Sequence, residues 1–118
     1  MDSDLSIRYH KLLKTLEKRF GEGLDTPAIL FLIGINELET KQEKFNKKEK
    51  MDLMHVAICT LLEPYGYYDF IGKDKDEWPH FELVKKIPFI NINEQNQLLM
   101  EAILDYFTEN NFSKINLN

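Results

Sequence analysis

The strongest structural signal in the chain is DTPAILFLIGINELE, residues 25–39. It opens with Asp25, whose side chain is suited to cap a helix, and Pro27 follows at the start of the helix, where proline is favoured. The residues after Pro27 are apolar on nearly every side of the expected helix. Because a helix of this kind must be covered all round, we expect residues 26–39 to form the buried helix of the fold.

Two further helices flank this segment. Before it, residues 4–20 carry an apolar stripe at helical spacing, and Gly21 and Gly23 end the helix. After it, Asn46 and Glu49 have the spacing of a capping box, which predicts a helix that starts near Lys47 and ends before Pro64. The expected apolar face of this third helix consists of Met51, Met54, Ala57, Ile58, Leu61 and Leu62.

A last helix is expected near the end of the chain. Asn93 is the predicted cap, and the residues after it carry a wide apolar stripe at helical spacing. The stripe is formed by Leu98, Leu99, Ala102, Ile103, Tyr106 and Phe107.

Residues 65–90 have a different character. Two aromatic, partly alternating runs flank a polar turn, which predicts a short β-hairpin or an ordered aromatic loop. Pro79 would have to lie at a sheet edge, because proline lacks a backbone N–H. The predicted fold is therefore mainly α, a compact bundle of about four helices with this hairpin or loop between the third and the fourth. We expect one domain over residues 1–109 and a flexible C-terminal tail over residues 110–118.

Composition places the chain among soluble globular domains. It has 118 residues, 43% apolar and 30% charged, with a formal net charge of -5. The net negative charge argues against nucleic-acid binding, and the one lysine cluster is interleaved with glutamates. The single Cys59, the lack of a signal-peptide pattern and the absence of a membrane-spanning run predict a cytoplasmic protein. The lysine cluster comprises Lys41, Lys44, Lys47, Lys48 and Lys50.

The run HVAICTLLEPYGYY, residues 55–68, and the triplet Trp78-Pro79-His80 resemble a family of short bacterial proteins with no assigned activity. The resemblance extends from about Pro27 to Phe107. It implies a small cytoplasmic protein and assigns no catalytic residue, metal or cofactor.

Four side chains could carry metal chemistry. His55, Cys59 and Glu63 follow one another at helical i, i+4 spacing, and His80 could supply a further ligand. Adjacent pairs could chelate an ion, whereas all three helical residues would span too long a distance, roughly 12 Å over eight residues. Burial of Cys59 and solvation of Glu63 explain the same residues without a metal. A metal-binding protein or metal-dependent enzyme that uses His55, Glu63 and His80 is therefore the alternative function, and no cofactor is expected otherwise.

The aromatic cluster of residues 65–81 favours a different function. Tyr and Trp combine apolar area with a polar tip, which suits them to protein partners, although they could equally form a second small core. The leading hypothesis is a non-enzymatic protein–protein interaction module, such as an adaptor, a regulator or a self-associating protein, with an aromatic and acidic surface. An antitoxin or immunity protein that covers a basic toxin would work in the same way. The predicted partner-binding residues are Tyr65, Tyr67, Tyr68, Phe70, Trp78 and Phe81.

Overall fold

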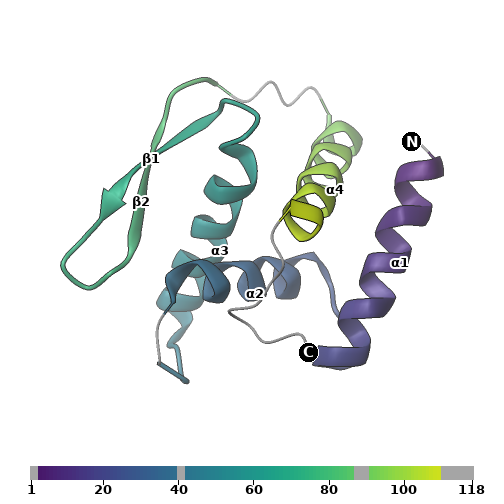
Figure 1. Cartoon of the computed structure of the whole chain (residues 1–118), viewed down its shortest axis with the longest axis horizontal. Helices are drawn as coiled ribbons and strands as arrows, with labels where there is room; N and C mark the ends of the chain where they lie inside the picture. Colours follow the sequence, from purple (N-terminus) through teal and green to yellow (C-terminus); the bar gives the residue numbers. More distant parts are fainter. Residues whose placement is uncertain (1–2, 40–41, 87–90, 110–118) are drawn as a thin grey trace.

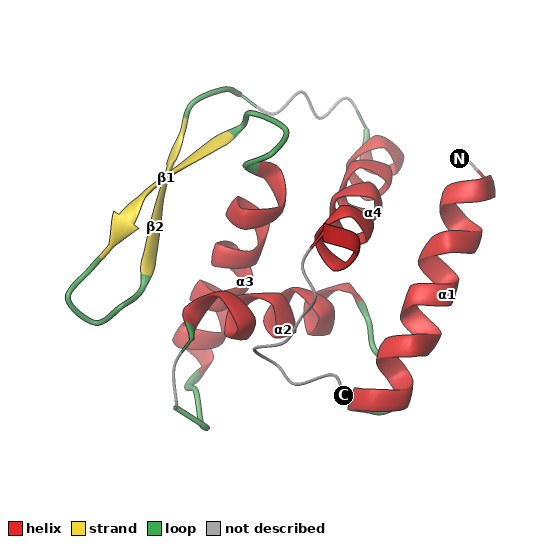
Figure 2. Ribbon diagram, in the orientation of Figure 1, coloured by secondary structure: helices red, strands yellow, loops and turns green. Residues whose placement is uncertain are grey.

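The computed structural model describes residues 3–39, 42–86 and 91–109. Within them the chain forms four helices, and one two-stranded antiparallel hairpin lies between the third and fourth helices (Figure 2). The expected mainly α fold with an inserted hairpin is confirmed. The expected tail, residues 110–118, lies outside the described residues. In chain order the elements are α1 (Ser3–Phe20), α2 (Thr26–Leu38), α3 (Lys47–Leu62), β1 (Tyr68–Lys73), β2 (Pro79–Leu83) and α4 (Ile92–Glu109).

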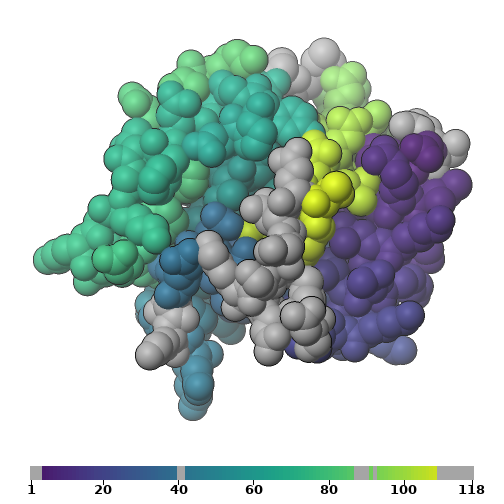
Figure 3. Space-filling view, in the orientation of Figure 1, coloured from purple at the N-terminus to yellow at the C-terminus, as the bar shows by residue number. Residues whose placement is uncertain are grey.

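The four helices share one apolar core, and the hairpin lies at the side of it. In Figure 1 the hairpin and α1 lie at opposite ends of the long axis, and α3 and α4 lie between them. In the space-filling view the hairpin extends from the left side of the molecule (Figure 3). The core is formed by buried side chains from all four helices: Leu16, Ile29, Leu30, Ile33, Ala57, Leu61, Leu62, Ala102, Ile103 and Tyr106.

The closest helix contact joins α2 and α3. A Cβ atom added to Gly34 would lie 2.3 Å from the backbone oxygen of Leu53. Only glycine therefore lets the two backbones approach this closely without a shift. As expected, α2 is the helix most deeply enclosed, and the Asp25 side chain caps it by accepting a 3.0 Å hydrogen bond from the Ala28 N–H.

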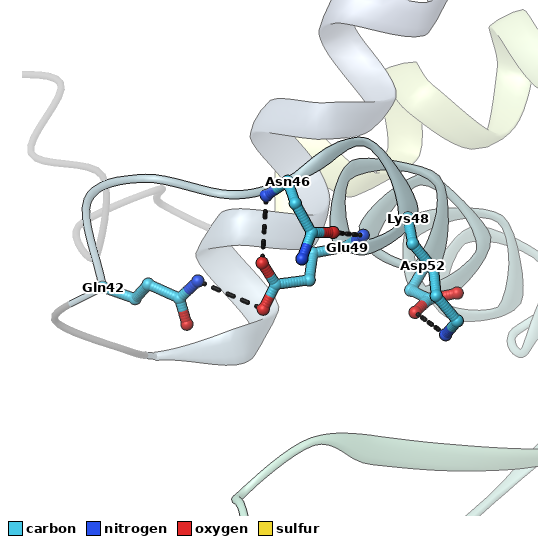
Figure 4. A network of polar contacts seen from close by, with 5 residues as sticks. All are labelled: Gln42, Asn46, Lys48, Glu49 and Asp52. Carbon is cyan, nitrogen blue, oxygen red and sulfur yellow. Dashed lines mark hydrogen bonds and ion pairs between the residues drawn. The ribbon is translucent and has the colours of Figure 1, made fainter.

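Helix α3 begins at Lys47, where the sequence predicts its start. The Glu49 N–H donates to the Asn46 side chain over 2.8 Å, and the Glu49 carboxylate accepts from the Asn46 N–H over 3.0 Å (Figure 4). This reciprocal pair is the predicted capping box. Gln42 donates to the same carboxylate over 3.2 Å, and Lys48 pairs with Asp52 one turn later. At the start of α3, the backbone N–H groups of Asn46 and Glu49 are thus hydrogen-bonded by each other's side chains.

Two details of the sequence interpretation are wrong. The cap of α4 is Asn91 instead of Asn93, because the Asn91 side chain accepts a 2.9 Å hydrogen bond from the Glu94 N–H and Asn93 lies inside the first turn. Met51, assigned to the apolar face of α3, is 60% exposed, whereas Leu53 is fully buried against α2. The reason is that α3 packs against both α2 and the hairpin, so its buried residues do not follow a single stripe.

Candidate functional site

The site begins with the register of the hairpin. Asp69 lies opposite Glu82, Phe70 lies opposite Phe81, and the Val84 N–H donates to the Tyr67 oxygen over 2.9 Å. Backbone groups alternate in an antiparallel pair, so the residue next to an inward-bonding residue points its N–H and C=O outward. The backbone groups of Phe70 on β1 and of Phe81 and Leu83 on β2 therefore point away from the partner strand.

A bulge interrupts the ladder after Phe70. Gly72 instead of Ile71 pairs with His80, and Gly72 has a φ of 121°, which favours glycine. The extra residue, Ile71, is 61% exposed. The bulge therefore directs a large apolar side chain into solvent.

The turn of the hairpin is organised by Asp74. One of its carboxylate oxygens accepts from the N–H groups of Asp76 and Trp78 over 2.8 and 3.1 Å, and the other lies 2.9 Å from His80 Nε2. These hydrogen bonds, that of His80 first, hold the pKa of the Asp74 carboxyl below its ordinary value of 3.8. The Asp74 carboxylate thus holds the β-turn of the hairpin.

The two outer edges of the hairpin differ. On β1 the outward N–H of Phe70 donates to the Glu63 carboxylate over 2.9 Å, and Lys73 pairs with Glu39 at 3.8 Å. These contacts tie β1 to the ends of α3 and α2. Side-chain coverage of this kind is a common way to protect an edge strand.

The outer edge of β2 borders the groove between the hairpin and α3. Within the described part of the chain, no hydrogen bond reaches the outward N–H of Phe81 or of Leu83. Pro79 occupies the next outward position, as expected for a proline in a strand, and there its missing N–H costs no ladder bond. Pro79 is buried and Phe81 is half-buried beside α3, so Leu83 is the exposed one of these three outward residues.

Exposed apolar side chains collect on the same element. Of the six large apolar residues exposed in the described segments, four belong to the hairpin or directly follow it. These four residues, Phe70, Ile71, Leu83 and Val84, are here called the hairpin apolar group. Phe70, one member of the group, packs against Phe81 with ring centroids 5.6 Å apart.

The predicted aromatic residues divide between the core and this surface. Tyr65, Tyr67 and Tyr68 are half-buried against the helical core; the Tyr65 hydroxyl donates to Asp105 over 2.8 Å, and the Lys85 amine lies 4.6 Å from the centre of the Tyr67 ring. Trp78 and Phe81 are half-buried between the hairpin and α3, and Phe70 is exposed. Sequence reasoning missed Ile71, Leu83 and Val84, because the bulge and the strand end are not visible in a pattern of alternation.

The structure brings three of the four predicted metal ligands to one groove and places Glu63 elsewhere. His55, Cys59 and His80 line one groove of about 350 Å³ between α3 and the hairpin, together with Asp74 and Trp78. Glu63 lines other pockets and holds the edge of β1. Among the described residues, no three His, Cys, Asp or Glu side chains are grouped so that they could hold a metal ion.

Cys59 is unsuited to nucleophilic chemistry. Its sulfur lies 3.7 Å from His55 Nε2, but burial raises the pKa of the thiol to about 11. A thiol with such a pKa stays protonated near neutral pH, whereas a cysteine nucleophile needs its thiolate.

Sequence reasoning also missed a buried polar network. The Asn36 amide donates to the Tyr106 hydroxyl over 2.6 Å, and the hydroxyl donates to Glu37. Burial, followed by the Glu37 carboxylate, raises the pKa of Tyr106. The Asn36 Oδ1 atom has no partner among the described atoms. The network ties α2 to α4, and no local pattern connects residues about 70 positions apart.

Comparison with known proteins leaves the site to be interpreted on its own geometry: no family model, no curated protein and no solved structure matches the chain. The likeness to a family of short bacterial proteins therefore stays a prediction. No helix in residues 3–39, 42–86 and 91–109 is long and apolar enough to cross a membrane.

Proposed function

We propose that the protein is a non-enzymatic, cytoplasmic protein–protein interaction module whose contact surface is the hairpin. The observation that carries the proposal is the hairpin apolar group, whose members are 48–61% exposed. Exposed apolar side chains gain free energy when a partner covers them, and large apolar patches are uncommon on monomers unless they function.

The polar surroundings fit this role better than they fit catalysis. Asp69 and Glu82 lie opposite each other on the hairpin and are exposed, so the apolar group has an acidic margin. An apolar centre with a polar rim is typical of protein interfaces, and the charges select the partner. The carboxylate with the most contacts in the hairpin, that of Asp74, is engaged in holding the turn.

Site-specific photo-crosslinking tests the proposal. A photoreactive phenylalanine analogue replaces Ile71 in the hairpin or, as a matched control, Ile7 on α1; the two side chains are 61% and 56% exposed. After irradiation of cells that normally make the protein, the analogue at position 71 is expected to give a discrete covalent adduct with a protein chain. The analogue at position 7 is expected to give none.

Either of two results would refute the proposal: no adduct from position 71, or the same adducts from both positions. The mass of the adduct also identifies the partner, because a second copy adds 14.0 kDa and another protein adds a different mass.

A further inference from the structure

We propose that a pocket between the ends of α2, α3 and α4 binds an arginine side chain of the protein partner. This inference rests on the proposed function and names the chemistry of its partner. The pocket has a volume of about 220 Å³, and it is here called the acidic pocket because the carboxylates of Glu37, Glu63 and Asp105 line it. Pockets for whole small molecules measure roughly 300–1,000 Å³, so a single side chain is the better match in size.

The three carboxylates lie at helix ends where negative charge is unfavourable. Glu37 belongs to the last turn of α2, Glu63 is the C-terminal cap of α3, and Asp105 directly precedes the last turn of α4. A helix C-terminus carries partial negative charge and is stabilised by a nearby cation. None of these three described helices has a lysine or arginine in its last turn. The acidic pocket thus collects negative charge from side chains and from helix ends.

The carboxylates are held in place by neutral donors. The Tyr106 hydroxyl donates to Glu37. The Tyr65 hydroxyl donates to Asp105 over 2.8 Å, and the β1 backbone donates to Glu63 over 2.9 Å. No lysine or arginine is among the described residues that line the pocket. The negative charge is therefore positioned but not neutralised by the lining.

A buried side chain behind the pocket gives independent support. Asn36 is 4% exposed, and its amide nitrogen is directed at the Tyr106 hydroxyl of the pocket wall, 2.6 Å away. Its oxygen Oδ1 has no hydrogen-bond partner within the described part of the chain. Buried acceptors are nearly always paired, so an unpaired one is explained by a donor that this chain does not supply. A guanidinium carries five N–H donors and no acceptor, which matches these unused acceptors.

The spacing of the carboxylates favours an extended cation over a metal ion. Among residues 3–39, 42–86 and 91–109, no three His, Cys, Asp or Glu side chains are close enough to ligate one ion. A guanidinium is planar and presents its donors in several directions, so it can bond to carboxylates that one metal ion could not reach together. An ammonium is a compact point charge with three donors. Arginine therefore fits the acidic pocket better than lysine does.

A neighbouring pocket connects the acidic pocket to the hairpin apolar group. The two pockets share three lining residues, among them Glu63, and the second one continues to Phe70. The lysine that lines the second pocket, Lys73, pairs with Glu39 at 3.8 Å. A partner segment that covers Phe70 can therefore also place an arginine in the acidic pocket.

An NMR titration of the isotope-labelled full chain tests the inference. The probe is arginine with an acetylated amino group and a methylamide at its carboxyl end, so that the guanidinium is its only charge. The control ligand is the same derivative of citrulline, in which a neutral urea replaces the guanidinium. We expect the arginine derivative to give saturable shifts of the Thr60, Glu63 and Asp105 amide signals and to bind at least about tenfold more tightly than the citrulline derivative. Added salt should weaken this binding.

Matched variants separate the pocket from general charge. Asp105→Asn removes one charge and keeps an oxygen that can accept from Tyr65, so it is expected to weaken the arginine derivative about threefold. Glu63→Gln keeps an acceptor for the β1 backbone and is expected to act in the same direction. Glu82→Gln removes the same charge from an exposed hairpin position outside the pocket and should leave binding unchanged. A folding defect would instead move helix signals in the absence of the probe.

Any of four results would overturn the inference: no shifts at the pocket, equal binding of the arginine and citrulline derivatives, tighter binding of the corresponding lysine derivative, or equal effects of Asp105→Asn and Glu82→Gln. A stronger response of the same signals to Mg²⁺ would overturn it in favour of a metal site. None of these results refutes the proposed function, because an adduct from position 71 does not require the acidic pocket. Lack of that adduct together with intact arginine binding would refute the proposed function alone.

Discussion

Helix α3 has two different neighbours, α2 and the hairpin. Against α2 the backbones approach so closely that Gly34 has no room for a side chain, and Leu53 is fully buried. Against the hairpin, α3 leaves a groove of about 350 Å³, and the hairpin keeps large apolar side chains in solvent. One helix thus takes part in a tight core contact and in a loosely packed surface.

The α2–α3 contact and the hairpin surface are therefore expected to have different roles, the first in stability and the second in interaction. The hairpin is held by polar contacts at particular points, namely the Asp74 turn and the Glu63 hydrogen bond to Phe70. Its exposed apolar side chains add little to the free energy of folding and remain available for a partner. Changes at the α2–α3 contact should therefore affect stability, and changes on the hairpin surface should affect association.

The largest stability effect is expected from Gly34→Val. The added side chain meets the Leu53 backbone, so α2 and α3 must separate, and we expect a loss of about 3 kcal/mol in the free energy of unfolding. Ile71→Ala on the hairpin should change it by less than about 0.5 kcal/mol. Urea denaturation followed by circular dichroism measures both. Equal losses would show that the hairpin and the helix pair are not energetically distinct.

A smaller loss is expected from Tyr106→Phe, which removes the hydroxyl between Asn36 and Glu37. A buried amide left without partners costs about 1–3 kcal/mol. The double variant Tyr106→Phe with Asn36→Leu should recover part of this loss, because the unpaired amide is then gone. Denaturation curves of the two variants and the wild type measure it. If the double variant is no more stable than the single one, the network is not the reason for the loss.

The smallest effect concerns the hairpin turn and pH. Because the folded-state pKa of Asp74 lies below 3.8, the stability that its carboxylate contributes is fully present above that pH. It is lost as the pH falls through the folded-state pKa. Amide exchange at Asp76 and Trp78, measured by NMR, should therefore accelerate at the acidic end of the range relative to helix amides. Asp74→Ala should remove this difference at every pH, and an unchanged acid response in that variant would contradict the assignment.

Local signals predicted the helical part of the fold well. The Asp25 cap and the Asn46–Glu49 capping box involve residues three apart, so they are readable in sequence, and both are present. The sequence predicts the α4 cap two residues late, because two asparagines lie close together and only the structure shows that Asn91 accepts the hydrogen bond.

The candidate site was only partly predictable. The aromatic run 65–81 indicated the hairpin, but which of its side chains reach solvent depends on the bulge at Ile71 and on packing against α3. Of the three predicted metal ligands, Glu63 bonds to β1, whereas His55 and His80 line the groove between α3 and the hairpin. The bond between Tyr106 and Asn36 depends on how α2 and α4 meet, which no local pattern contains.

Photo-crosslinking from position 71 tests the central claim most directly, that the hairpin is the surface by which the chain binds a protein partner. The photoreactive analogue at position 71 is expected to give a discrete adduct with a protein chain, and the analogue at Ile7, a similarly exposed residue on α1, is expected to give none. If position 71 gives no adduct, or if both positions give the same adducts, the hairpin is not the contact surface.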